Sequence, residues 1–261
     1  MIVTISSGIR GGVGKSVLAT VLGYTLNYLE SPTLVVDVGG GSTRFVLPGD
    51  VAPPYTRDLP RDYNAIVQTT ITLKVERRRI FRKPEVEERT VPFYLTPEVR
   101  ELSDEEIDEV VGAIPGLEDY FDYVIIDMPA VSNRHYWRFL DVTDVQVVCL
   151  VPERAAYEAI IATNEVRAPA VIAVMNKFDR ERSTHGEALD AVKQYFSRWP
   201  GSRVVTVPFD PQLAMVAAYG LEYLVKASLA ESTTDAITSL VGALENLAEF
   251  AEEGRRELAE A

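Results

Sequence analysis

The sequence has one cysteine and two histidines among its 261 residues. Because Cys149 stands alone, the chain can form no internal disulfide and no metal or iron–sulfur site built from its own cysteines. His135 and His185 are too few and too isolated for a histidine metal site. A chain so poor in cysteine fits a reducing compartment, and we expect it to be cytoplasmic.

Long apolar stretches and excess positive charge are also lacking. No stretch reaches the roughly 18 uninterrupted apolar residues of a membrane span. The first residues, MIVTISSGIR, have no basic segment followed by a long apolar one, so we expect no signal peptide. The 26 Lys and Arg residues against 39 Asp and Glu residues give a net charge of −13. This charge opposes non-specific adhesion to nucleic acid or anionic lipid except where basic residues cluster.

Short apolar runs rich in β-branched residues are abundant. Six of them predict strands, at residues 2–6, 33–38, 123–127, 145–151, 170–175 and 203–208. The runs are nearly continuous rather than alternating, which indicates strands covered on both faces. Helices are expected between them, at residues 15–29, 104–112, 153–165, 185–197 and 211–219. The alternation predicts an α/β fold, a doubly wound and mainly parallel sheet with helices on both faces and its ligand at the carboxyl ends of the strands.

An insertion interrupts this alternation at residues 52–100. It contains six prolines, and the alternating pattern between them predicts a β-hairpin or a small extra sheet. Directly after it, Ser103 and Glu106 have the spacing of a capping box, which marks the start of a helix.

The C-terminal stretch, residues 229–260, is helical by composition. Leu240, Leu244, Leu247 and Phe250 lie on one side of this helix and glutamates on the other. Anionic lipid would repel the glutamates, so we expect core packing or a subunit contact rather than a membrane. We expect the whole chain to form a single domain.

The segment SGIRGGVGKS, residues 7–16, follows the first predicted strand and opens the first helix. Its glycines allow backbone N–H groups to face phosphate oxygens, and the helix adds its positive end. Lys15 can reach the outer phosphates, and the Ser16 hydroxyl is placed to coordinate magnesium. Ile9 stands where the strict pattern G-x-x-x-x-G-K-[ST] has its first glycine, which is tolerable only if its φ angle is negative.

RGGVGKS resembles the deviant Walker A loop K-G-G-x-G-K-[ST] of the ParA/MinD family of P-loop ATPases. The resemblance implies a P-loop NTPase type of fold, bound ATP and Mg²⁺, and an ATP-dependent sandwich homodimer. Arg10 takes the place of the signature lysine and would reach the partner's phosphates, as an arginine finger does. The phosphate-contacting residues that it implies are Gly11, Gly12, Val13, Gly14, Lys15, Ser16 and Val17.

Later segments resemble the same family in the expected order. FDYVIIDMPA is similar to its Walker B region, so Asp127 would hold magnesium together with Ser16 and with Asp37 of switch I. VMNKFD offers Asn176 to the base, and VPFDPQL offers Pro208, Phe209 and Asp210. NKFD also fits the N-K-x-D guanine signature of GTPases, whereas the late segment favours adenine. Arg10, Lys15, Asp37 and Asp127 are the implied catalytic residues.

The switch I segment departs from the family. It reads VVDVGGGST, with Gly39 and Gly41 where the family carries a second aspartate and a glutamine. Loss of a group that orients the attacking water can slow phosphoryl transfer by orders of magnitude. Slow hydrolysis, a surrogate carboxylate such as Asp50 or Asp58, and a simple glycine hinge all stay open.

We therefore expect a nucleotide switch that binds ATP and magnesium and hydrolyses ATP slowly. Its work would be the partitioning or positioning of DNA or a protein assembly, with a partner protein stimulating turnover. Two alternatives are a hydrolysis-deficient regulatory or scaffold protein and a metabolic ligase related to dethiobiotin synthetase.

The stretch KVERRRIFRK in the insertion is the one candidate for binding DNA. Its cations are Lys74, Arg77, Arg78, Arg79, Arg82 and Lys83. A hairpin could present them to phosphates without sequence preference. The alternative is a solvated hairpin face on which they pair with nearby glutamates.

Overall fold

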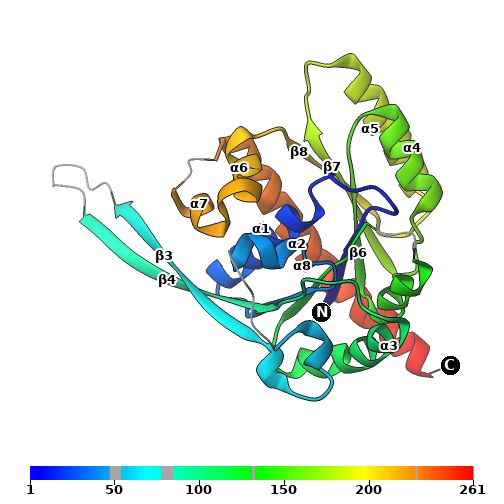
Figure 1. The fold of residues 1–261 in the computed structure, drawn as a ribbon. Helices are drawn as coiled ribbons and strands as arrows, with labels where there is room; N and C mark the ends of the chain where they lie inside the picture. The colour runs from blue at the N-terminus through cyan, green and yellow to red at the C-terminus, as the bar shows by residue number, and fades with distance from the viewer. Residues whose placement is uncertain (48–53, 78–84, 131–132, 227–228, 261) are drawn as a thin grey trace.

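The computed structural model describes residues 1–47, 54–77, 85–130, 133–226 and 229–260. The strands are β1 (Ile2–Ser6), β2 (Thr33–Asp37), β3 (Val67–Arg77), β4 (Glu85–Thr96), β5 (Tyr123–Asp127), β6 (Val145–Leu150), β7 (Ala170–Phe178) and β8 (Arg203–Pro208). They form one sheet in the order β3-β4-β2-β5-β1-β6-β7-β8 (Figure 1). Every neighbouring pair is parallel except β3 with β4, so the predicted mainly parallel sheet is confirmed.

The helices alternate with the strands. They are α1 (Lys15–Tyr28), α2 (Gly41–Val46), α3 (Asp104–Ala113), α4 (Arg154–Thr163), α5 (Ser183–Phe196), α6 (Pro211–Tyr219), α7 (Leu221–Lys226) and α8 (Glu231–Glu260). Short 3₁₀ segments are η1 (Thr56–Asp58), η2 (Tyr63–Ala65), η3 (Ile114–Asp119) and η4 (Arg134–Val142). The predicted strands and helices are present close to their expected ends. The sequence reading missed α2, α7 and the 3₁₀ segments.

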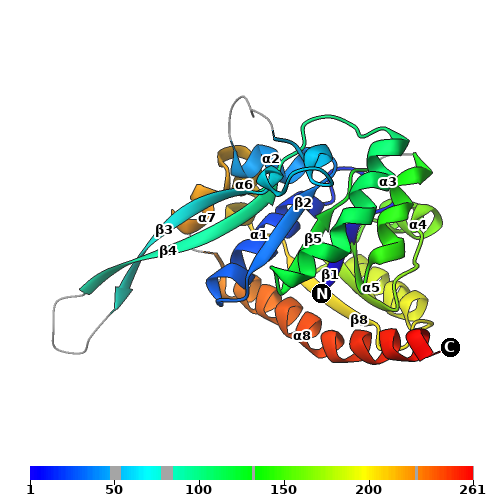
Figure 2. The ribbon, with the colours of Figure 1, turned by 90° about the horizontal axis from the view of Figure 1, so that it is seen from below.

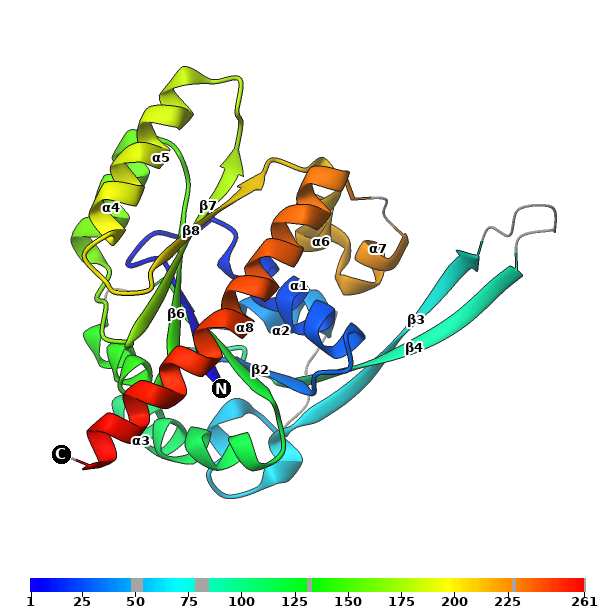
Figure 3. The same cartoon turned by 180° about the vertical axis from the view of Figure 1, so that it is seen from behind.

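Both faces of the sheet are covered, which explains the nearly continuous apolar strands. Val35 of β2 and Ile125 of β5 point to one face, where α1 packs against these strands and α8 packs against α1 and against β6, β7 and β8. Val36 and Ile126, the next residues along the same strands, point to the other face, which α3, η3 and η4 cover. Figures 2 and 3 show α8 running across the first of these faces.

The start of α3 and the apolar stripe of α8 are the helix features that the sequence predicted locally. Ser103 Oγ accepts a bond from Glu106 N at 3.3 Å and the Glu106 carboxylate accepts one from Ser103 N at 2.8 Å, so the capping box is confirmed. In α8, Leu240, Leu244 and Leu247 are buried, so this stripe packs on the core. The side chain of Phe250 lies outside the described residues. Among the described helices, none has the length and hydropathy needed to cross a membrane.

The insertion contains the predicted hairpin, but the hairpin does not form a separate sheet. β3 and β4 pair antiparallel from Val67 with Leu95 to Arg77 with Glu85. The end of β4 also pairs in parallel with β2, so the hairpin extends the main sheet, and its outer part projects from the body as an arm (Figure 1).

The predicted DNA contact cannot be located on this arm. Arg78, Arg79, Arg82 and Lys83 lie outside the described residues, as do the side chains of residues 73–87, which include Lys74 and Arg77. The DNA contact stays a prediction.

Candidate functional site

The carboxyl ends of the parallel strands meet at one edge of the sheet, where ligands of such sheets bind. A cavity of about 400 Å³ lies there. Nine predicted site residues line it, namely Gly12, Gly14, Lys15, Ser16, Val17, Asn176, Pro208, Phe209 and Asp210. Phe45, Lys177, Leu213, Ala214 and Ala217 complete the lining. The structure thus brings the predicted phosphate and base residues to one cavity.

The first glycine loop, residues 7–14, joins β1 to α1. Gly12 and Gly14 have positive φ angles of 73° and 99°, a region that favours glycine. A Cβ atom added to Gly14 would lie 2.3 Å from Asn176 Nδ2, so a side chain there would also clash. Ile9 is exposed and does not have a positive φ angle, so the loop accommodates this departure from the strict pattern.

In the first glycine loop, backbone carbonyls accept hydrogen bonds from the protein, whereas several backbone N–H groups are unpaired. Within the described chain, the backbone N–H groups of residues 11–14 donate to no protein acceptor. Two carbonyls are held by side chains from β7: Asn176 Nδ2 donates to Val13 O at 2.7 Å, and Lys177 Nζ donates to Gly12 O at 3.0 Å. A loop with unpaired N–H groups at a helix N-terminus is suited to bind an anion.

Asn176 has a structural use in addition to its predicted contact with the base. Its Oδ1 accepts a bond from Lys177 N at 2.9 Å, and Lys177 has a positive φ angle of 58°. Cys149 supports the same loop, because its Sγ donates to Val13 O at 3.4 Å. Burial raises the pKa of Cys149 to about 12, so the thiol stays protonated. The base contact of Asn176 stays a prediction.

The two cations of the loop have different environments. Lys15 is buried, and its Nζ donates to Arg10 O at 3.5 Å, the upper limit for such a bond. Burial lowers the pKa of Lys15, and the nearby Asp127 offsets part of that shift. Arg10 is exposed, and its backbone bonds to Ser7, with Arg10 N donating to Ser7 O at 3.2 Å. Lys15 therefore lines the cavity, whereas Arg10 lies at the surface of the protein.

Asp37 and Asp127 end neighbouring strands and are paired in register. Burial is the main cause that raises the pKa of both carboxyls, and the nearby Asp127 helps to raise the pKa of Asp37 to about 7. Asp127 Oδ2 accepts bonds from Ser42 Oγ at 2.7 Å and from Ser42 N at 3.2 Å. Asp127 Oδ1 is buried and has no hydrogen-bond partner among the residues that the structure describes. One oxygen at the strand end is therefore left for a ligand.

These residues fit a magnesium ion. A Cβ atom added to Gly41 would lie 2.0 Å from Ser16 Oγ and 3.1 Å from Asp127 Oδ2, so the two predicted ligands flank the same backbone. A hydroxyl and one or two carboxylates, completed by phosphate and water, are a usual magnesium set. The unpaired Asp127 Oδ1 is an atom that a cation would satisfy.

The second glycine loop, residues 38–41, folds down onto this position. Asp37 Oδ1 accepts bonds from Gly39 N at 3.0 Å and Gly40 N at 2.7 Å. A Cβ atom at Gly39 would lie 2.7 Å from Pro129 Cβ, so in this conformation residue 39 can only be glycine. The surrogate carboxylates stay untested: Asp58 caps η1 by accepting from Tyr55 N at 2.9 Å, and Asp50 lies outside the described residues.

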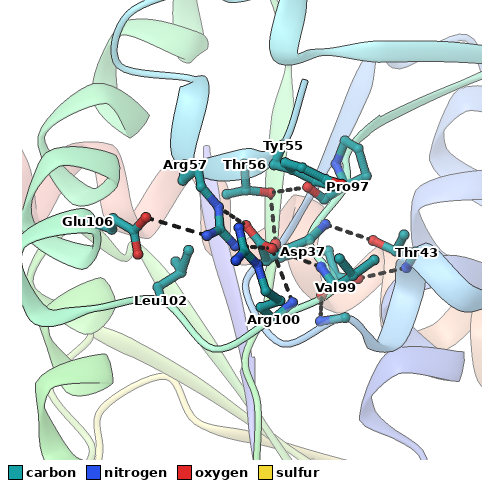
Figure 4. A network of polar contacts seen from close by, with 12 residues as sticks. Asp37, Thr43, Tyr55, Thr56, Arg57, Pro97, Val99, Arg100, Leu102 and Glu106 are labelled. Atoms are coloured by element: carbon teal, nitrogen blue, oxygen red, sulfur yellow. Dashed lines mark hydrogen bonds and ion pairs between the residues drawn. The ribbon is translucent and has the colours of Figure 1, made fainter. Parts of the chain in front are cut away.

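A buried polar network behind the second glycine loop connects it to the insertion. Thr43 N donates to Asp37 Oδ2 at 2.6 Å, and Thr43 Oγ1 accepts from Glu98 N at 3.0 Å. The fully buried Glu98 carboxylate accepts from Arg57 Nε at 3.1 Å, and Arg57 also reaches Glu106 of α3 at 3.4 Å (Figure 4). The segment after β4 and the start of α2 therefore share one set of hydrogen bonds.

β8, α6 and α2 contribute the apolar lining of the cavity, where the base is predicted to lie. Phe209 is 60% exposed, whereas Asp210 is buried. Asp210 Oδ1 caps α6 by accepting from Gln212 N at 2.8 Å, and Oδ2 accepts from Ala230 N at 3.0 Å. Burial alone would raise the pKa of Asp210, but these hydrogen bonds outweigh it and lower the pKa. Asp210 therefore fixes the wall of the cavity, and its contact with the base stays a prediction.

The aspartate of N-K-x-D lies outside the cavity. Asp179 lines a different hollow between β8 and α8. Its Oδ1 accepts from Glu181 N at 3.0 Å, and its Oδ2 lies 3.2 Å from Arg182 Nε. The carboxylate that a guanine signature needs thus contacts residues of its own turn and does not line the cavity.

Comparison with known proteins identifies the family. Residues 4–224 match the model of the CobQ/CobB/MinD/ParA nucleotide binding domain. The chain belongs to this family. The resemblance to ParA/MinD ATPases that the loop motif indicates is confirmed at the level of the family.

Individual relatives of the family are distant. An uncharacterised ATP-binding protein of Methanocaldococcus jannaschii is 26% identical over 223 residues, which cover 83% of this chain and 78% of that protein. The structure of a Cyanothece McdA variant in complex with ATP has a TM-score of 0.65 and 16% identity, covering 94% of this chain and 96% of that one. MinD of Pyrococcus horikoshii complexed with Mg-ADP has a TM-score of 0.62 and 18% identity, covering 96% and 98%. The two structures share the fold.

Several residues of the site were not found by sequence reasoning. Ser42 and Thr43 contact the two aspartates from inside α2, whose N-cap is Gly40, so no N-cap side chain in the sequence marked this helix. Arg57 and Glu98 carried no signal either, because charged residues in a polar insertion usually lie at the surface.

Proposed function

We propose that this chain is a ParA/MinD-like nucleotide switch that binds ATP with Mg²⁺ and hydrolyses ATP slowly. The observation that carries the proposal is the first glycine loop, whose N–H groups at residues 11–14 are unpaired beside Lys15, Ser16 and the free oxygen of Asp127. This combination gives donors for phosphate next to oxygens for a divalent cation.

Each residue has a part in this proposal. Residues 11–14 and Lys15 would hold the phosphates, and Ser16 and Asp127 would hold Mg²⁺, with Asp37 beside them. Bound Mg²⁺ neutralises charge that develops on the transferred phosphoryl group. Asp37 would act on the second glycine loop, because its carboxylate accepts the N–H groups that shape that loop.

Adenine is the base that we propose. The carboxylate of Asp179, which guanine reading needs, does not line the cavity and contacts Glu181 and Arg182 instead. The ATP-binding relative and the ATP complex of McdA agree with this choice.

Dimerisation is the finer part of the proposal. Arg10 is exposed beside the loop, and in an ATP-dependent sandwich dimer it would contact the partner's phosphates. We propose a single cytoplasmic P-loop ATPase domain that positions DNA or a protein assembly, with a partner protein stimulating turnover.

A switch without turnover is the second candidate. The second glycine loop favours it, because Gly39 and Gly41 supply no carboxylate or amide to orient water, and close contacts with Pro129 and Ser16 leave no room for one. Such a protein would bind ATP and release no phosphate even with its partner present.

The test is the solution mass by light scattering with Mg-ATP and with Mg-ADP, followed by phosphate release. We expect the mass to double with ATP alone. Arg10→Ala should keep ATP affinity within about twofold, because its guanidinium lies outside the cavity, and should abolish the doubling. A monomer in both nucleotides would contradict the dimer, and an absence of phosphate release would favour the second candidate.

A further inference from the structure

Phe45 is a cavity residue that no motif indicated. It lies on α2, the short helix that follows the second glycine loop, and it lines the same cavity as Lys15 and Ser16. The next two residues, Val46 and Leu47, pack against the hydrophobic core instead. The Phe45 ring is therefore turned to the cavity, while its neighbours anchor the helix.

The cavity has two chemically different ends. Lys15 and Ser16 mark the phosphate end, where the described groups are polar. At the other end Phe45 shares the lining with Leu213, Ala214 and Ala217 of α6, and α2 and α6 lie in contact. A ligand that fills this cavity needs an anionic part and a flat apolar part, which describes a nucleotide.

The position of α2 is fixed from both sides. At its start, Ser42 bonds to Asp127, and Thr43 N bonds to Asp37. At its end, a Cβ atom added to Gly220 would lie 2.8 Å from Phe45 O, so the backbone of α2 sits tightly against the turn between α6 and α7. Phe45 and the magnesium position are thus connected by one turn of helix.

We infer that Phe45 contacts the nucleoside of the bound nucleotide and determines its affinity and base preference. The inference rests on the proposed function. An aromatic ring in a half-buried wall offers a face to a base, and a purine has more surface to place on it than a pyrimidine. Phe209, the aromatic residue that the motif indicates, is more exposed and has less support.

Calorimetric titration with two ligands tests this role. Mg-ATP has both the phosphate and the nucleoside part, whereas magnesium tripolyphosphate has only the first. We expect Phe45→Ala to weaken ATP binding about 10- to 100-fold, the range of a lost aromatic–base contact, and to leave tripolyphosphate binding within about twofold. Phe45→Ala should also reduce the preference for ATP over CTP.

Two further variants control the measurement. Tyr219→Ala removes an exposed aromatic ring from α6 outside the cavity, and it should leave the affinity for both ligands unchanged. Phe45→Leu keeps an apolar side chain and should weaken ATP binding less than Phe45→Ala, and it carries the test if the alanine variant does not fold.

The outcomes separate this inference from the proposed function. An equal loss for ATP and tripolyphosphate would overturn the nucleoside contact, because Phe45 would then only hold α2 in place. Unchanged ATP affinity in both Phe45 variants would overturn it as well. If the unmodified protein binds tripolyphosphate but not ATP, the proposed function itself fails.

Discussion

Two glycine loops, one after β1 and one after β2, use their backbones in opposite ways. In the first, residues 7–14, side chains of Asn176 and Lys177 hold the carbonyls, and the N–H groups of residues 11–14 stay unpaired. In the second, residues 38–41, the carboxylate of Asp37 takes the N–H groups of Gly39 and Gly40. Similar composition therefore yields one loop ready for an anion and one that is saturated by the protein itself.

The comparison explains why glycine content alone does not indicate a phosphate site. What distinguishes the loops is whether the side chains that reach them donate or accept hydrogen bonds. Amide and ammonium groups leave donors for a ligand, whereas a buried carboxylate consumes them.

Breaking the first loop should have the largest effect. Lys15→Ala removes the buried cation of the cavity, and we expect Mg-ATP affinity to fall about 100-fold, the scale of a lost charge-assisted hydrogen bond. Calorimetry measures this change. Lys193→Ala, an exposed cation on α5, is the control and should bind normally. If Lys15→Ala binds Mg-ATP as tightly as the unmodified protein, the first loop does not bind the phosphates.

Disrupting the polar network behind the second loop should lower the free energy of unfolding. Glu98→Gln leaves the Arg57 guanidinium without its buried carboxylate, and we expect the free energy of unfolding to fall by about 3 kcal/mol. Urea denaturation measures this loss. Glu106→Gln is the matched control, because that ion pair is longer and more exposed and glutamine keeps the capping box, so a loss below about 1 kcal/mol is expected. Equal losses in both variants would contradict the special position of Glu98.

Adding a methyl group to the second loop should lower the free energy of unfolding by a smaller amount. Gly41→Ala places a methyl group against Ser16 Oγ, and overpacking of this kind lowers the free energy of unfolding by about 1 to 3 kcal/mol. Gly112→Ala in α3 meets no atom within 4 Å and should be neutral or stabilising. Thermal melts compare the two. A normal melt for Gly41→Ala would mean that the loop opens freely.

The smallest effect, taken per pH unit, is the pH dependence of stability without nucleotide. The pKa of Asp37 is raised from its ordinary 3.8 to about 7, so the folded state binds this proton more tightly than the unfolded state does. Asp37 therefore contributes stability fully below about pH 4 and loses it as pH rises through about 7, by at most about 1.4 kcal/mol per pH unit. Urea denaturation from pH 5 to 8 measures the slope. Asp37→Asn should flatten it, and an unchanged slope would assign the effect to another group.

Much of the phosphate half of the site could be predicted from the sequence. Lys15, Ser16 and Asp127 sit in local motifs at strand ends, and the parallel sheet brings strand ends together. In the apolar half, a motif indicated Pro208 and Phe209, but the residues that α2 and α6 contribute could not be predicted this way. Phe45 and Leu213 are ordinary apolar residues in the sequence, and only the contact between α2 and α6 makes them neighbours.

The sequence by itself determined the mainly parallel sheet, most of its helices and the glycine loop between β1 and α1, because periodicity and glycine spacing act over a few residues. The tertiary structure decided that the insertion joins the main sheet beside β2 and that Glu98 lies buried against Arg57. It also decided that Asp179 lines an adjacent hollow and not the cavity itself. These features depend on which distant segments meet, and no local pattern carries that information.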